Sequence, residues 1–258
     1  MKHELSHVDD GVDVTFDEYF VIIDMDRTLL ATDHLGVYLY HLFHMTGVEQ
    51  DEIATFLDRY VGDGVDTLTL LLKRFGDRLA DSTHRELSSG QPAYDEVAED
   101  LLEGYDLEVV RSDLLLPGAR ELCALFDQQS IPYAVLTTGG EVFQQLKLAL
   151  LRRLLDVPRL SAMVVSQSTI PDKTAYLSHA LWDGEMGSFR IPPEMSGGER
   201  SHYARKVVIL DDKHENLATS HQNIYAYHIG TYTLEGIVDY LEVGSLDDLI
   251  KARADIDK

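Results

Sequence analysis

The chain has 258 residues, 45% of them hydrophobic, which suffices for a packed interior in one large domain or in a core with a smaller partner. Lys and Arg number 22 against 45 Asp and Glu, and the formal net charge of −23 argues against nucleic acid and anionic lipid as partners. No stretch is apolar enough for a signal peptide or a membrane span, so we expect a cytoplasmic protein without membrane contact.

The first predicted strand ends in two carboxylates. The run from Phe20 to Asp24 is rich in β-branched and aromatic residues, as buried parallel strands are, and Asp26 follows two positions later. Two carboxylates and the hydroxyl of Thr28 at a strand end suit phosphoryl transfer with a divalent cation, because Mg²⁺ prefers hard oxygen ligands. By itself this short pattern equally fits an acidic turn.

A long segment with mostly helical patterns separates the first strand from the second. Two apolar stripes have the spacing of a buried helix face: Ile53, Phe56, Leu57 and Tyr60, then Val97, Leu101, Leu102 and Tyr105. The sequence therefore predicts an inserted helical domain over residues 33–114, between core segments of residues 1–32 and 115–258.

The core resumes after Pro117 and Gly118 with the helix ARELCALFDQQ, in which the single cysteine, Cys123, has a core setting. Further strands are predicted at Pro132 to Thr137, Ala162 to Ser166, Lys206 to Asp211 and Ile224 to Ile229. Strands that alternate with helices predict an α/β fold with a doubly wound parallel sheet, whose ligands gather at the carboxyl ends of the strands. Residues 183–200 are rich in Gly and Pro, which predicts a loop.

More polar residues stand at or near the later strand ends. YAVLTTGG places Thr137 at the end of the second strand, with Thr138 as the alternative by one register. PDKTAYLSHAL places Lys173 at a helix start, and KVVILDDKHENL ends a strand with Asp211 and Asp212. Each has a plain explanation alone, as a helix cap, a solvated lysine or an exposed turn, but their joint occurrence at strand ends favours one shared site.

In order along the chain, VIIDMDRTLL, YAVLTTGG, PDKTAYLSHAL and KVVILDDKHENL resemble the four signatures of the haloacid dehalogenase superfamily. The resemblance covers the core and not the helical insert. It implies a Rossmann-like parallel sheet with helices on both faces, and a helical cap inserted after the first strand. The insert found by periodicity lies at that place.

The resemblance implies that Asp24 attacks the phosphorus of a small phosphorylated substrate and forms an aspartyl phosphate, which water then hydrolyses. Asp26 would be the general acid and base. A carboxylate nucleophile needs no deprotonation at neutral pH, but the leaving alkoxide needs a proton, so a raised pKa is expected at Asp26.

The implied cofactor is Mg²⁺, held by the side chain of Asp24, the backbone carbonyl of Asp26 and an acid of the fourth signature. Asp212 is the first choice for that acid and Asp211 the second. The phosphate-binding residues implied are Thr137 or Thr138 and Lys173, which supplies the positive charge that the bulk of the chain lacks.

Within the superfamily, the acid at Asp26 favours a phosphatase or a phosphomutase over a transport ATPase or a dehalogenase. A phosphomutase keeps the same acid pair and returns the phosphoryl group to a sugar, so it stays open as an alternative. A catalytically silent binding or regulatory protein with the same fold is the other alternative, and the intact motifs count against it. The physiological substrate and the oligomeric state are not determined by the sequence.

Overall fold

The computed structural model describes residues 15–39, 47–60, 74, 94–165, 172–198, 202–219 and 221–256. The strands of these residues form a seven-stranded sheet in the order β3-β2-β1-β6-β5-β4, with β7 also paired to β6. The strands are β1 (Thr15–Ile23), β2 (Tyr133–Thr138), β3 (Ala162–Val165), β4 (Trp182–Asp183), β5 (Ser188–Ile191), β6 (His202–Asp211) and β7 (Ile224–His228).

The strands that the sequence predicted run parallel, in the order β3-β2-β1-β6-β7, which confirms the α/β class. The described part of residues 183–200 is not a loop throughout, so that prediction is wrong. β4 and β5 form an antiparallel hairpin beside the first half of β6, and the short helix α10 (Pro193–Ser196) follows. The glycines and prolines punctuate these elements, while Phe189 and Ile191 bury their side chains in the core.

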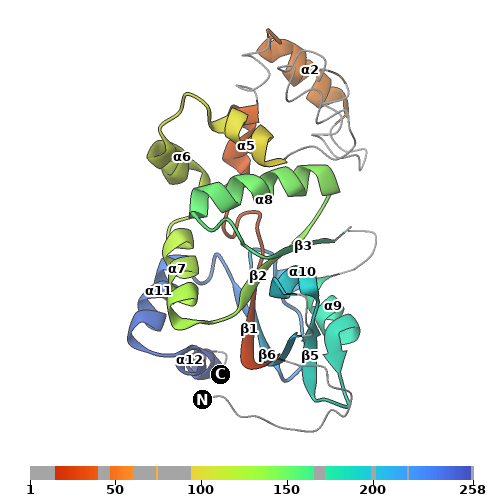
Figure 1. Ribbon diagram of the computed structural model, residues 1–258, viewed down its shortest axis with the longest axis vertical. Coiled ribbons are helices and arrows are strands. Elements are labelled where there is room, and N and C mark those ends of the chain that lie inside the picture. Colours follow the sequence, from red (N-terminus) through yellow and green to blue (C-terminus); the bar gives the residue numbers. More distant parts are fainter. Residues whose placement is uncertain are drawn as a thin grey trace.

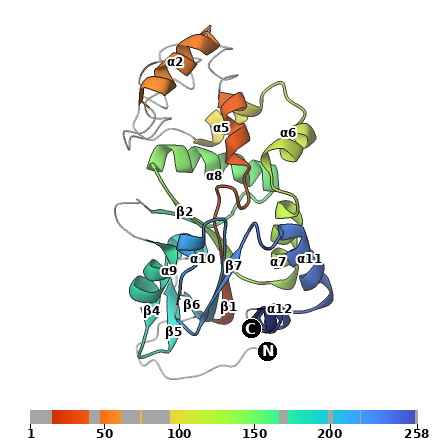
Figure 2. The same cartoon turned by 180° about the vertical axis from the view of Figure 1, so that it is seen from behind.

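Alternate residues of β1 enter two cores on opposite faces of the sheet. Val21 and Ile23 belong to one core, and Phe20 and Ile22 to the other. Figures 1 and 2 show helices on both faces. The first core includes residues of α7 (Ala119–Gln129), α8 (Glu141–Leu155), α11 (Leu234–Val243) and α12 (Leu246–Ile256), and the second includes residues of α9 (Lys173–Tyr176), η3 (Leu177–Leu181) and α10.

The described helices between β1 and β2 lie beyond α8, at the top of Figure 1. They include η1 (Thr32–His34), α2 (Gln50–Tyr60), α5 (Tyr94–Leu102) and α6 (Leu107–Leu114). Ile53, Val97 and Leu101 of the predicted stripes are buried, while the side chains of Leu57 and Tyr60 lie outside the described part. Among the described helices, none combines the length and apolarity that a bilayer crossing requires.

The chain leaves and rejoins the sheet region through two segments that pair with each other. The Ala31 amide donates to the Leu114 carbonyl at 2.8 Å, and the Leu116 amide donates to the Leu29 carbonyl at 2.9 Å. The backbone between these points can therefore form a separate helical unit without disturbing the sheet. The division into core and cap stays a prediction.

Candidate active site

Adjacent strands bring three carboxylates together. Asp24 follows β1, Asp211 is the last residue of β6, and Asp212 comes next. Since β1 and β6 are parallel neighbours, their carboxyl ends meet at one edge of the sheet. One oxygen from each of the three carboxylates lies within 4.8 Å of the others.

Lys173 reaches the same cluster from the start of α9. The Asp172 side chain accepts a hydrogen bond from the Ala175 amide, so it caps this helix and fixes where it begins. Lys173 Nζ contacts Asp24 Oδ1 and donates to Asp211 Oδ2 at 2.7 Å, and the side chain is only 1% exposed. Lys173 thus joins the nucleophile predicted after β1 to the acid that ends β6.

The two acids of the fourth signature differ in their hydrogen bonding. Both carboxylate oxygens of Asp211 accept from Asn216 Nδ2, at 3.1 and 3.0 Å, and Oδ1 also accepts from the Lys213 amide at 2.8 Å. Asp212 Oδ1 is buried and has no hydrogen-bond partner among the described residues. Burial raises the pKa of the Asp212 carboxyl, and the charge of Asp211 adds to the shift.

These groups fit a divalent cation. Three carboxylates against one ammonium leave two negative charges in a largely buried cluster. Burial raises the pKa of the Asp24 carboxyl, while the charge of Lys173 opposes the shift and that of Asp211 adds to it. Asp212 Oδ1, which has no partner in the described part of the chain, and the carboxylate of Asp24 beside it offer the hard donors that Mg²⁺ prefers.

Asp26 is held by a different set of donors. Lys147 Nζ of α8 donates to both carboxylate oxygens, at 2.6 and 2.7 Å. The Thr32 hydroxyl donates to Oδ1 at 2.6 Å, and Gln144 Nε2 donates to Oδ2 at 3.2 Å. The carboxylate therefore accepts hydrogen bonds at both oxygens from three side chains.

The expected raised pKa at Asp26 is wrong for this geometry. Burial would raise the pKa, but the charge of Lys147 and the hydrogen bonds from Lys147, Thr32 and Gln144 outweigh it and lower the pKa below its usual value. The carboxyl of Asp26 is therefore ionised in this conformation, and in this form it can act as a base. The sequence motif identified Asp26 but not Lys147, whose charge lowers the pKa of Asp26.

Thr137 is buried at the end of β2, and its hydroxyl donates to Gln144 Oε1 at 3.3 Å. Gln144 Nε2 also donates to the carbonyl of Thr138 at 3.0 Å. Gln144 therefore links the end of β2 to Asp26. Of the two threonines proposed from the sequence, Thr137 has its hydroxyl on the side of Asp26 and Gln144.

Sequence reasoning missed Gln144 and Lys147, although a signal was present. They lie three positions apart on α8, which places both on one face of the helix. That face is otherwise apolar, and both side chains are buried. A buried lysine and glutamine in an apolar stripe need polar partners, and only the fold shows that Asp26 is the one they share.

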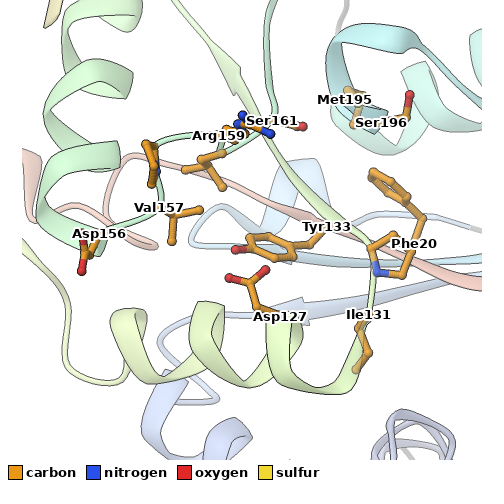
Figure 3. A pocket seen from close by; sticks show the side chains of 13 residues that line it. Phe20, Asp127, Ile131, Tyr133, Asp156, Val157, Arg159, Ser161, Met195 and Ser196 are labelled. Carbon is orange, nitrogen blue, oxygen red and sulfur yellow. The ribbon is translucent and has the colours of Figure 1, made fainter. Parts of the chain in front are cut away.

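Two cavities of the described part lie away from this cluster. One of about 460 Å³, shown in Figure 3, is lined by Tyr133 at the start of β2 and Ser161 just before β3, together with Asp127 and Arg159. The other, of about 620 Å³, lies on the far side of α9 and is lined by Trp182 among others. None of the site residues predicted from the sequence lines either cavity.

No protein-family model matches the chain, and a comparison with curated protein sequences gave no match. Among solved structures, a haloacid dehalogenase-like hydrolase from Burkholderia xenovorans LB400 has 18% identity over 82% of this chain and 83% of its own, with a TM-score of 0.42. A protein described as a β-phosphoglucomutase from Thermotoga maritima has 18% identity over 86% and 92%, with a TM-score of 0.36. A HAD family hydrolase from Deinococcus radiodurans R1, solved with phosphate and sodium, has 14% identity over 86% and 98%, with a TM-score of 0.31.

These overlaps are too loose to place individual residues. The strand order of the sheet and the positions of the motifs at its strand ends show the parallel α/β core that the sequence predicted.

Proposed function

We propose that this chain is a Mg²⁺-dependent phosphomonoester hydrolase of the haloacid dehalogenase superfamily, which acts through an aspartyl phosphate on Asp24. The observation that supports it most is that Asp24 and Asp212 meet at adjacent strand ends and that Lys173, at the start of α9, contacts Asp24. A buried nucleophile, a carboxylate oxygen that no group of the described residues occupies and a fixed ammonium are the groups that phosphoryl transfer requires.

In the first step, a carboxylate oxygen of Asp24 forms a bond to phosphorus while the bond to the leaving oxygen breaks. Asp26 gives a proton to that oxygen, and because Lys147 favours the ionised carboxylate in this conformation, the step requires Asp26 to gain this proton before the bond to the leaving oxygen breaks. In the second step, water attacks phosphorus, Asp26 accepts a proton from the water, and the bond to Asp24 breaks. Lys173 orients Asp24. The Thr137 hydroxyl, which donates to Gln144 Oε1 in the structure, would rotate to donate its hydrogen to a phosphoryl oxygen instead.

The ion would be held by Asp24, Asp212 and the backbone carbonyl of Asp26. Asp212 is preferred to Asp211 because both carboxylate oxygens of Asp211 already accept hydrogen bonds, from Lys173, Asn216 and the Lys213 amide. When bound, Mg²⁺ would offset the negative charge of the phosphoryl group and of the carboxylates around it. The residues of this chain supply the nucleophile and the proton transfers.

The helical segment of residues 33–114 is proposed to be a cap that excludes water and selects the leaving group. A small phosphorylated metabolite as substrate and a cytoplasmic location are further parts of the proposal.

The test is phosphate release by the purified full chain from a panel of phosphometabolites and p-nitrophenyl phosphate, with and without Mg²⁺. We expect release that requires Mg²⁺ and is lost in Asp24→Asn. An isomerised sugar phosphate in place of free phosphate would indicate a phosphomutase. No turnover of any compound would refute an enzymatic role and favour a silent binding protein.

A further inference from the structure

Figure 1 shows helix α8 between α5 on one side and the sheet on the other. On the side of the insert, Arg153 pairs with Glu99 of α5, and Arg111 Nε of α6 donates to the Leu154 carbonyl at 2.9 Å. On the side of the sheet, α8 directs Gln144 and Lys147 to Asp26. One helix therefore contacts both the insert and the second acid of the first motif.

Lys147 does not have the environment of a solvated helix residue. Its side chain is 3% exposed, whereas an unpaired lysine extends its ammonium into water. Desolvating an ammonium is costly unless a partner of opposite charge compensates, and here Asp26 lies against it. The Phe143 ring lies 4.7 Å from Lys147 Nζ and adds a second attractive contact.

The contacts to Asp26 specify the orientation of its carboxylate. Lys147 Nζ donates to both oxygens, which fixes the plane of the group relative to α8. Thr32 donates to Oδ1 alone and Gln144 to Oδ2 alone, so rotation about the side-chain bonds would break at least one contact. Of these donors, only Lys147 carries a charge and touches both oxygens.

We propose that Lys147 is a positioning residue, which sets the orientation from which Asp26 exchanges a proton with the leaving oxygen of the substrate. The inference rests on the proposed function, because it requires Asp26 to be the proton donor and acceptor. Lys147 acts through Asp26, whose two carboxylate oxygens accept its hydrogen bonds. Because Lys147 lies on α8, the position of this helix and of the helices packed on it affects where Asp26 is held for the proton transfer.

The role predicts a dependence on the leaving group. A nitrophenolate leaves with little need of a proton, whereas an alkoxide needs one. Misplacing Asp26 should therefore slow the hydrolysis of an alkyl phosphate and spare p-nitrophenyl phosphate. A lysine that only compensates buried charge would affect both substrates alike, and a lysine that binds substrate would change KM for both.

The experiment compares Lys147→Met and Lys147→Gln with the wild type, on p-nitrophenyl phosphate and on the best alkyl phosphate of the panel. We expect kcat for the alkyl phosphate to fall about 10- to 100-fold, since small misplacements of a reacting group cost that much. For p-nitrophenyl phosphate we expect less than about a threefold change. Lys206→Met is the matched control, because Lys206 pairs with Glu18 and Tyr19 rather than with the carboxylates of the site.

The test also includes the double variant of Asp26 and Lys147 and the melting temperatures of the Lys147 variants. In an Asp26→Asn background, Lys147→Met should cause no further loss on the alkyl phosphate, because both changes remove one function. Equal losses on both substrates, a changed KM alone, or unchanged kcat for the alkyl phosphate in a folded variant would overturn the inference. An inactive wild type would refute the proposed function instead. If Lys147→Met melts below the assay temperature, Lys147→Gln, which keeps a donor, carries the comparison.

Discussion

Gly139 leaves the space that the Gln144 side chain occupies: a Cβ at position 139 would overlap Gln144 Nε2. The backbone φ of Gly139 is +155°, which residues with a side chain rarely adopt. Since Gln144 donates to Asp26 and to the carbonyl of Thr138, this glycine lets the turn between β2 and α8 bring Gln144 against the site.

Gly139→Ala should displace Gln144 and strain the turn. We expect a loss of about 1 to 3 kcal/mol of unfolding free energy, the usual cost of an unfavourable backbone conformation, together with reduced kcat. Chemical denaturation and steady-state kinetics measure the two effects. Gly187→Ala is the control, because Gly187 also has a positive φ, but a Cβ there would meet no atom within 4 Å. Equal kcat in the two variants would contradict a role for Gln144 at the site.

Asp24→Asn should abolish turnover and preserve the fold. The amide is no longer an effective nucleophile, and losing a nucleophile costs on the order of 10³-fold or more in kcat. Phosphate release measures the loss, and circular dichroism checks the fold. Asp248→Asn is the control, because Asp248 is exposed in the first turn of α12 and accepts a hydrogen bond from the Ser245 hydroxyl, away from the site. Turnover by Asp24→Asn close to that of the wild type would end the assignment of the nucleophile.

Lys173→Ala should raise KM and lower kcat together, because the ammonium orients Asp24 and serves both the bound substrate and the transition state. It should also destabilise the fold without Mg²⁺ by about 3 to 5 kcal/mol, since two buried carboxylates lose their shared cation. Denaturation with and without Mg²⁺ measures this, and Lys206→Ala provides the control. An unchanged KM with a fall in kcat alone would restrict Lys173 to orienting the nucleophile.

Mg²⁺ should stabilise the protein, because an ion that binds only the folded state adds about 2.7 kcal/mol at 100 times its Kd. Asp212→Asn should remove most of this effect, since Asp212 offers the buried oxygen without a partner among the described residues. Thermal unfolding in a Mg²⁺ titration measures both. Glu194→Gln, exposed on α10, should respond like the wild type. Full stabilisation of Asp212→Asn by Mg²⁺ would shift the ligand to Asp211.

His34 should titrate above the ordinary histidine range. Its Nδ1 lies 2.9 Å from the Asp113 carbonyl and 3.0 Å from Asp113 Oδ1, and both contacts raise the pKa of His34. The contribution to stability is therefore full below the unfolded value of about 6.5 and is lost as the pH rises through the folded value. NMR titration of the imidazole measures the pKa. Asp113→Asn, which keeps the carbonyl contact and removes the charge, should lower the pKa of His34 in part, and an unchanged pKa would exclude the carboxylate as a cause.

The sequence determined the elements of the core and the edge at which the polar residues gather. Runs of apolar residues ending in Asp24, Thr137 and Asp211 are signals that local pattern carries, because strand length, burial and the punctuating glycines are properties of neighbouring residues. The parallel arrangement followed from strands alternating with helices. The hairpin of β4 and β5 escaped prediction because its strands are short, and because β5 also pairs with β6, which lies outside the hairpin.

Only the tertiary structure decided the partners of each acid. Asp26 is separated from Lys147 by 121 residues, and Asp24 from Lys173 by 149, so no local pattern pairs them. No local pattern distinguishes Asp211 from Asp212 either. Asp211 accepts hydrogen bonds from Asn216, whereas Asp212 has a buried oxygen without a partner in the described part of the chain. The charge state of a buried carboxylate depends on what folding packs against it, and that is a property of the assembled strand ends rather than of the motif.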